Sequence, residues 1–376
     1  MSEKILSFCD ISGNSVKNYQ GSRKYIATGD IVNNKICSYT EVEYKSKPSR
    51  ANQEAELGDV LFAKMKETRK VICITEDNVD CIYSTGFYVI KPKKSVLTEY
   101  LYWLFNSSNF NRNKDKLCKG ATQKALNNEG LKKIAIKKLP TIEEQKNIVS
   151  KLNKISSLIN SKMKQLELLD ELIKSQFVEM FGDPVSNNLN WNILKMSELG
   201  TLERGTSKHR PRNAPELLGG IYPLIQTGDV SNSGLYITDY KSTYSELGLK
   251  QSKMWRKDTL CITIAANIAQ TSILTFDACF PDSVVGFITN ALVNNIFIHY
   301  WFGFLQKNID AQATQVAQKN INLKVLNNLD VIVPPIELQN QFADIVKQID
   351  KQKFEIEKSL KEMQELYESL MEKYFG

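Results

Sequence analysis

The chain repeats itself, and this duplication constrains its fold more than any other feature. Thr28-Gly-Asp-Ile31 recurs as Thr227-Gly-Asp-Val230, and Gly58-Asp-Val-Leu-Phe62 recurs as Lys257-Asp-Thr-Leu-Cys261, both at an offset of 199 residues. A period of this length is far beyond that of a solenoid repeat and indicates a domain duplication. The 376 residues are also too many for one ordinary hydrophobic core. We therefore predict two copies of one unit.

The best-matched part of each copy begins at a proline and ends at Phe-Gly. Pro140-Thr-Ile-Glu-Glu-Gln145 corresponds to Pro335-Ile-Glu-Leu-Gln339, and proline followed by acidic residues is typical of a helix start. Apolar residues then recur at alternating steps of three and four, which predicts a long helix in residues 140–182 and another in 334–376. Because each stripe is narrow, we expect coiled-coil packing against another helix, within one chain or between two. The candidate pairing residues are Leu152, Ile159, Leu166, Ile173, Ile349, Ile356, Leu360 and Met363.

The intervening segments, residues 1–139 and 183–333, have the pattern of two globular domains. Short β-rich runs between turn residues predict a mainly β core in each, for example Val60-Leu-Phe62 and Leu260-Cys-Ile-Thr-Ile264. The aromatic segments 97–105 and 296–305 are the best helix candidates inside the domains. The expected fold class is therefore α+β.

Charge is distributed unevenly along the chain. The first 139 residues hold 24 Lys and Arg against 15 Asp and Glu, a net charge of +9, whereas the formal charge of the whole chain is +7. Residues 183–333 are almost neutral, with 13 basic against 12 acidic residues. A local basic excess favours an acidic partner such as nucleic acid, so we expect the first domain to carry most of the electrostatic attraction.

Candidate DNA contacts are basic or amide side chains in turns and loops, where they can reach phosphates and base edges. In the second domain the basic loop 204–212 could equally be a solvated surface loop. The repeated Gln-Lys pair, at 123–124 and 318–319, precedes an asparagine in each copy and could be a shared structural turn instead of a contact. The candidates are Lys45, Lys47, Arg50, Lys64, Lys66, Arg69, Lys70, Lys119, Gln123, Lys124, Arg204, Lys208, His209, Arg210, Arg212, Asn267, Gln318 and Lys319.

Signatures of catalysis are missing from the sequence. It holds no phosphate-binding loop, no dinucleotide-binding glycine motif and no amino-methyltransferase motif. Two histidines, of which we expect His299 to be structural, and seven cysteines without a C-x-x-C pair suggest neither a metal site nor a disulfide framework. We predict no catalytic and no metal-binding residues. The start of the chain does not resemble a secretory signal and no apolar run is as long as a membrane span, so we expect a cytoplasmic protein without membrane contact.

With this order of domains and helices the chain resembles the specificity subunit of Type I restriction-modification systems over essentially its whole length. The most telling segments are Leu139-Pro-Thr-Ile-Glu-Glu-Gln145, Ser175-Gln-Phe-Val-Glu-Met-Phe-Gly-Asp-Pro184, Val333-Pro-Pro-Ile-Glu-Leu-Gln339 and the paired Thr-Gly-Asp segments. The resemblance implies two target-recognition domains, each reading half of an asymmetric bipartite site in double-stranded DNA. It also implies that the two helices pair antiparallel and fix the spacing between the half-sites.

The resemblance further implies a non-catalytic subunit that binds no cofactor itself. S-adenosylmethionine is then expected on two partner modification subunits, and ATP with Mg²⁺ on restriction subunits. The alternative from the residues alone is a non-enzymatic interaction protein that homodimerises through its coiled-coil helices.

Overall fold

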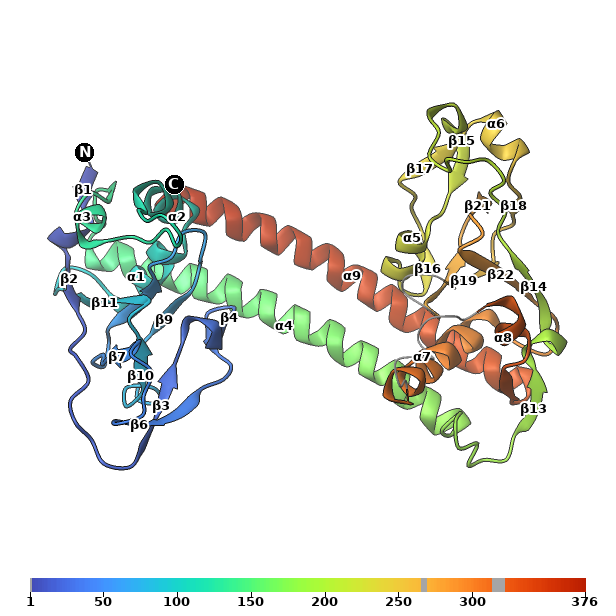
Figure 1. The fold of residues 1–376 in the computed structure, drawn as a ribbon, viewed down its shortest axis with the longest axis horizontal. Helices are drawn as coiled ribbons and strands as arrows, with labels where there is room; N and C mark the ends of the chain where they lie inside the picture. The colour runs from blue at the N-terminus through green and yellow to red at the C-terminus, as the bar shows by residue number, and fades with distance from the viewer. Residues whose placement is uncertain (1, 265–268, 313–321) are drawn as a thin grey trace. The chain divides into compact units, whose positions relative to one another are not determined.

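The computed structural model describes residues 2–264, 269–312 and 322–376. It divides into two compact units, the first formed by Met1–Lys164 with Glu357–Gly376 and the second by Gln165–Ile356. Each unit combines one β-rich globular part with segments of two long helices, α4 (Ile142–Phe181) and α9 (Ile336–Phe375), as Figure 1 shows. The expected α+β class with two β-rich domains and two long helices is confirmed.

The globular part of the first unit contains two four-stranded sheets and two short two-stranded ones. One four-stranded sheet has the order β2-β11-β8-β9 and is antiparallel, and the other has the order β6-β3-β10-β7 with a parallel β3–β10 pair. Pairs β1-β12 and β4-β5 complete the strands. The bounds are β1 (Ser2–Lys4), β2 (Cys9–Ser12), β3 (Ser22–Ile26), β4 (Ile31–Val32), β5 (Lys35–Ile36), β6 (Thr40–Glu43), β7 (Ala51–Gln53), β8 (Val60–Ala63), β9 (Val71–Cys73), β10 (Ile82–Ser84), β11 (Phe87–Pro92) and β12 (Ala135–Lys137).

Three helices, α1 (Thr98–Asn106), α2 (Ser108–Leu117) and α3 (Asn128–Leu131), accompany these sheets. Apolar side chains of α1 pack with those of β8 and β11, so the predicted aromatic helix of the first domain is a core element. In the same cluster lie Ile148 and Leu152 of α4 and Phe375 of α9, which continue the core of the domain onto the long helices.

The second unit repeats this design. Its five-stranded sheet has the order β14-β22-β19-β20-β16, its four-stranded sheet has the order β17-β15-β21-β18, and β13 pairs with β23. The bounds are β13 (Asn192–Lys195), β14 (Gly200–Arg204), β15 (Leu218–Leu224), β16 (Tyr236–Ile237), β17 (Ser242–Tyr244), β18 (Met254–Trp255), β19 (Leu260–Thr263), β20 (Thr271–Leu274), β21 (Ala278–Cys279), β22 (Val284–Thr289), β23 (Asp330–Val333), α5 (Thr227–Asn232), α6 (Glu246–Lys250), α7 (Asn295–Gln312) and α8 (Leu323–Asn327).

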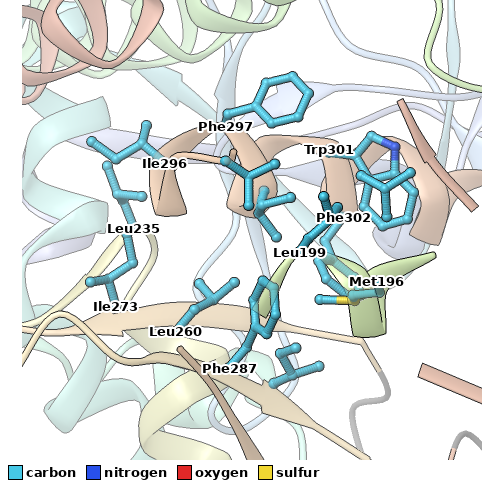
Figure 2. Close-up of a cluster of buried hydrophobic side chains, with 14 of the residues drawn as sticks. Met196, Leu199, Leu235, Leu260, Ile273, Phe287, Ile296, Phe297, Trp301 and Phe302 are labelled. Atoms are coloured by element: carbon cyan, nitrogen blue, oxygen red, sulfur yellow. The ribbon is translucent and has the colours of Figure 1, made fainter. Parts of the chain in front are cut away.

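A large apolar cluster fills the second unit between its five-stranded sheet and its helices. Figure 2 shows Leu260, Ile273 and Phe287 of the sheet facing side chains of α7, including Phe297 and Trp301. Segments of both long helices enter the same cluster. The second predicted aromatic helix is therefore also a core element.

The start of α4 follows from its sequence. The backbone N–H of Thr141 donates to Glu144 Oε2 at 2.8 Å, and the N–H of Glu144 donates to Thr141 Oγ1 at 3.3 Å, a reciprocal capping box. The backbone N–H and the hydroxyl of Thr141 both donate to the ionised carboxylate of Glu144, and these bonds hold its pKa below its usual value. At the other end Gly182 adopts a φ of +73°, a left-handed conformation that favours glycine just after a helix.

Within each unit α4 and α9 are in contact. In the second unit Lys353 Nζ lies 2.7 Å from Asp170 Oδ1, and the ring of Phe342 packs edge-on against Phe177. In the first unit the beginning of α4 and the end of α9 share one apolar cluster. Because the start of each helix lies with the end of the other, the pair is antiparallel, as the resemblance implied.

The candidate pairing residues divide into two sets. Leu152, Ile173 and Ile349 are buried within the clusters of the globular parts, so the outer ends of the stripes pack into domain cores and not only against a helix. The sequence pattern could not show this, because a core and a partner helix select the same apolar spacing. The other set is half-buried along the middle of the helices: Ile159, Leu166, Ile356, Leu360 and Met363.

None of the described helices is long and apolar enough to cross a membrane.

Candidate nucleic-acid interface

The loop between β8 and β9 carries four of the candidate cations of the first domain. Lys66 and Arg69 are exposed at this turn, whereas Lys64 and Lys70 are half-buried. Lys64 Nζ donates to Thr85 O at 2.9 Å and lies 4.5 Å from the ring centre of Tyr88, and burial lowers the pKa of this lysine. Lys70 Nζ donates to Thr28 O at 2.6 Å.

The second predicted group lies beside this loop. The N–H of Lys66 donates to Lys124 O at 2.9 Å, and the N–H of Leu126 donates to Lys64 O at 2.9 Å, so the two segments run as paired backbone. Ala125, in the middle of this second segment, also forms an antiparallel β-bridge with Lys119. Side chains of Lys119, Gln123 and Lys124 are exposed there.

A tight turn between Lys119 and Lys124 needs its glycine. Gly120 has a φ of +138°, and a Cβ there would clash with the carbonyl oxygen of Gln123. Only glycine combines this backbone conformation with so close an approach. The turn thus brings Lys119 and Lys124, five positions apart in sequence, close together. Residues 64–70 and 119–126 form one short region of paired backbone, which we call the basic ladder.

The third group, Lys45, Lys47 and Arg50, is linked to the β8–β9 loop through one residue. The N–H of Thr85 donates to Arg50 O at 2.9 Å, while its carbonyl accepts from Lys64. Lys47 Nζ is held by Ala51 O at 2.6 Å and by Asn52 Oδ1, whereas Lys45 and Arg50 are exposed. Arg50 is therefore linked through Thr85 to Lys64 of the β8–β9 loop, and this loop pairs in turn with the segment that holds Lys124.

The repeated Thr-Gly-Asp segment borders this region, a position that its sequence did not reveal. Asp30 Oδ2 accepts from the N–H of Ala27 at 2.7 Å, and Asp229 Oδ2 accepts from the N–H of Gln226 at 2.8 Å, so the aspartate has the same structural role in both copies. In the first copy the carbonyl of Thr28 is also the acceptor for Lys70.

Sequence reasoning also missed Lys114, which supports the β8–β9 loop from α2. Its side chain is only 1% exposed, and Nζ donates to Met65 O at 2.9 Å and to Thr68 O at 2.7 Å. Burial lowers its pKa, and the neighbouring Asp115 accepts from the N–H of Glu67 at 2.9 Å. Lysine is rarely buried without paired acceptors, and no sequence signal separates this lysine from the exposed ones around it.

The basic loop 204–212 of the second domain is tied down at several points. Gln251 Oε1 accepts from the N–H groups of Lys208, at 2.7 Å, and His209, at 3.1 Å. Arg204 lies at the end of β14, and its Nε donates to Asp282 O at 2.9 Å. Side chains of Lys208, Arg210 and Arg212 are exposed, and His209 is half-buried. These hydrogen bonds therefore fix the position of the loop, while most of its basic side chains remain exposed.

The carboxylate of Asp282 pairs with two arginines of that loop. Asp282 forms an ion pair with Arg212, and its Oδ2 lies 3.5 Å from Arg210 Nη2. Arg210 Nη1 also donates to Ser207 O and His209 O, at 2.7 and 2.8 Å. No local sequence pattern links Asp282 to this loop, because it lies 70 residues beyond Arg212.

Three candidates of the second domain, Asn267, Gln318 and Lys319, lie outside the described residues. The asparagine that follows each Gln-Lys pair has a structural role. Asn127 Oδ1 accepts from the N–H of Gly130 at 2.8 Å, and Asn322 Oδ1 accepts from the N–H of Val325 at 3.1 Å, so each asparagine caps the start of a short helix.

The second histidine, His299, which we expected to be structural, is half-buried on α7. His299 lies within hydrogen-bond distance of Thr271 Oγ1, at 2.9 Å, and burial lowers its pKa to about 4. Within residues 2–264, 269–312 and 322–376 no group of three His, Cys, Asp or Glu side chains could hold a metal ion.

Comparison with known proteins gives the class of protein to which this architecture belongs. The model of the Type I restriction modification DNA specificity domain matches residues 8–169 and 188–366, one match in each copy. The chain is 25% identical to the putative type I restriction enzyme MjaX specificity subunit of Methanocaldococcus jannaschii, over 82% of this chain and 77% of that protein.

Two solved structures share the fold. The first, described as the basis of complex assembly and conformational transition of the type I R-M system, has a TM-score of 0.64 at 20% identity, covering 99% of this chain and 96% of that one. The second, the type I restriction-modification S subunit of M. genitalium, has a TM-score of 0.60 at 14% identity, covering 100% and 96%.

The chain therefore belongs to the Type I restriction modification DNA specificity family. It is a sequence-specificity subunit of a Type I restriction-modification system, and subunits of this kind are non-catalytic.

Proposed function

We propose that residues 1–139 and 183–333 are two target-recognition domains, each of which reads one half of an asymmetric bipartite site in double-stranded DNA. The observation that carries this proposal is the linkage of three separate cation groups of the first domain. Thr85 bonds to Arg50 and Lys64, and the backbone of residues 64–66 pairs with that of residues 124–126. Phosphate contacts position a protein on DNA, and base-edge contacts specify the sequence. Exposed Lys66, Arg69 and Lys124 supply charges for the first role.

The two domains would read different sequences because their surfaces differ. The first presents a basic ladder around residues 64–70 and 119–126, whereas the second has almost no net charge and offers arginines already paired with an aspartate. Arginine can pair with both acceptors of a guanine edge, so the 204–212 loop fits base readout better than general attraction.

We propose that residues 140–182 and 334–376 fix the spacing between the half-sites and dock two modification subunits. Helices α4 and α9 are each 40 residues long, which corresponds to roughly 60 Å at about 1.5 Å per residue. Their exposed apolar side chains support a docking role, since such groups on a helix favour a protein partner. They include Met163 and Leu168 on α4, with Phe354 and Leu366 on α9.

In this proposal the partners supply all of the chemistry, in the cytoplasm where the DNA is. Modification subunits would bring S-adenosylmethionine, and restriction subunits would bring ATP and Mg²⁺. Homodimerisation through the helices is less well supported, because α4 and α9 contact each other within one chain.

Methylome sequencing tests the proposal. The chain would be expressed with its modification subunit in a host free of other methylation, and methylated bases would be mapped by single-molecule sequencing. We expect one bipartite motif with two different halves, which disappears when this chain is omitted. A methylome with no motif that depends on this chain contradicts the proposal.

A further inference from the structure

Three arginines of the second domain converge on the turn that connects β21 to β22. Asp282 in this turn pairs through its carboxylate with Arg210 and Arg212, and through its carbonyl oxygen with Arg204. The carboxylate is about one-third exposed, and the two paired arginine side chains are 55% and 44% exposed. A guanidinium group has five N–H donors, so both groups keep donors that the carboxylate does not use.

The approach of the loop to this turn is built into the backbone. The N–H of Gly205 donates to Val284 O at 2.8 Å, and a Cβ at this glycine would clash with the carbonyl oxygens of Phe280 and Pro281. Ser252 Oγ donates to Thr206 O at 2.8 Å. The loop is therefore fixed at its base, and Asp282 acts on the arginine side chains beyond it.

We propose that Asp282 is a positioning residue for sequence recognition by the second domain. It holds Arg210 and Arg212 as one preorganised pair, whose outward N–H donors meet base-edge acceptors of the half-site. Without the carboxylate, these long side chains have to be ordered when DNA binds, and the conformational entropy lost at each side chain lowers the affinity. The inference rests on the proposed role of the 204–212 loop in DNA binding.

Positioning and simple electrostatics predict opposite results when Asp282 is replaced. An aspartate beside DNA repels phosphates, so removing its charge should tighten binding to every duplex if attraction were its only influence. If Asp282 positions the arginines, removing it weakens binding to the recognised sequence while binding to other sequences stays equal or tightens. The sign of the change on the motif thus separates the two roles.

The test uses the full chain assembled with its modification subunits and two duplexes of equal length, one with the methylated motif and one with the second half-site scrambled. For Asp282→Asn we expect motif affinity to fall on the order of tenfold, the scale of one good arginine contact to a base. Affinity for the scrambled duplex should not fall. Asp330→Asn is the matched control, because it removes a carboxylate from another exposed ion pair of this unit, with Lys195.

Arg210→Ala and Arg212→Ala in the same assay separate this inference from the proposed function. If both leave motif affinity unchanged, the loop does not contact DNA and its place in the proposed interface fails. If they weaken binding but Asp282→Asn tightens or does not change it, only the positioning role is overturned. Equal losses on both duplexes with Asp282→Asn also overturn it, since misfolding or a general phosphate contact would act on both.

Discussion

Gln145 and Gln339 make the same three hydrogen bonds in the two halves of the chain. Gln145 Oε1 accepts from the N–H of Leu97 at 2.9 Å, and its Nε2 donates to Ser95 O and Pro140 O. Gln339 Oε1 accepts from the N–H of Asn294 at 2.9 Å, and its Nε2 donates to Leu292 O and Pro334 O. Both side chains are fully buried, so each long helix is joined to its domain by the same contact.

Replacing Gln145 with leucine should destabilise the first unit. The change keeps the approximate size of the side chain but leaves the N–H of Leu97 and the carbonyls of Ser95 and Pro140, all partly buried, without their partner, at a cost of about 1–3 kcal/mol. Urea denaturation monitors the free energy of unfolding. Gln364→Leu, at an exposed position of α9, should change it by less than about 0.5 kcal/mol. Equal stabilities of the two variants would show that the buried contact contributes nothing.

Substituting Lys66 or Lys124 by alanine should weaken DNA binding equally for all sequences. Each exposed cation that contacts a phosphate releases about one counterion, so the slope of log K against log salt should fall by roughly one unit per residue. Filter binding or fluorescence anisotropy over a series of salt concentrations measures the slope. Lys94, exposed just beyond the far end of β11, is the matched control and should leave the slope unchanged. If Lys94→Ala has the same effect as Lys66→Ala, the attraction is general to the domain and not a property of the ladder.

Lys114→Met should loosen the β8–β9 loop and reduce DNA affinity together. The variant retains the apolar stem but leaves Met65 O and Thr68 O without a donor, which costs about 1–3 kcal/mol of stability. Denaturation and DNA titration measure the two effects. Lys116→Met removes an exposed lysine from the same helix and should affect stability little. A stable Lys114→Met variant with wild-type affinity would contradict the supporting role.

His299 should make the second unit less stable in mild acid. Its pKa is about 4 in the folded state and 6.5 in the reference state, so the unfolded chain binds more protons between these values. Stability therefore rises with pH across this window, and lowering the pH from 7 to 5 should cost roughly 2 kcal/mol through this residue. A His299→Gln variant, measured at both pH values, should lose that part of the pH dependence. An unchanged difference between pH 7 and pH 5 would show that His299 does not titrate in this way.

The elements that the sequence predicts best are those with long periodic patterns. Alternating steps of three and four from Ile148 to Phe177 predict α4 almost to its ends, because proline and Phe-Gly mark where it starts and stops. Strand pairing was not predictable, since the order β14-β22-β19-β20-β16 depends on contacts between distant segments. The local sequence pattern likewise does not predict that β3 and β10 pair in parallel.

For the interface, residue type alone could nominate the cations but not sort them. Exposed Lys66 and buried Lys114 are both lysines in polar segments, and only the carbonyls of the β8–β9 loop distinguish them. Likewise nothing near Arg210 in the sequence indicates Asp282, because tertiary folding brings the two together. Counting charges along the sequence identifies the basic domain. The burial and ion pairing of each side chain decide which of these charges can still contact DNA.

Exchanging one domain tests the central claim most directly. Residues 1–139 would be replaced by the corresponding domain of another Type I specificity subunit of known target, and the methylated motif of the assembled enzyme would be mapped by single-molecule sequencing. If each domain reads one half-site, one half of the motif changes to that of the donor, while the other half and the spacer length remain. A motif that stays the same, or one in which both halves change, would contradict division of the reading between the two domains.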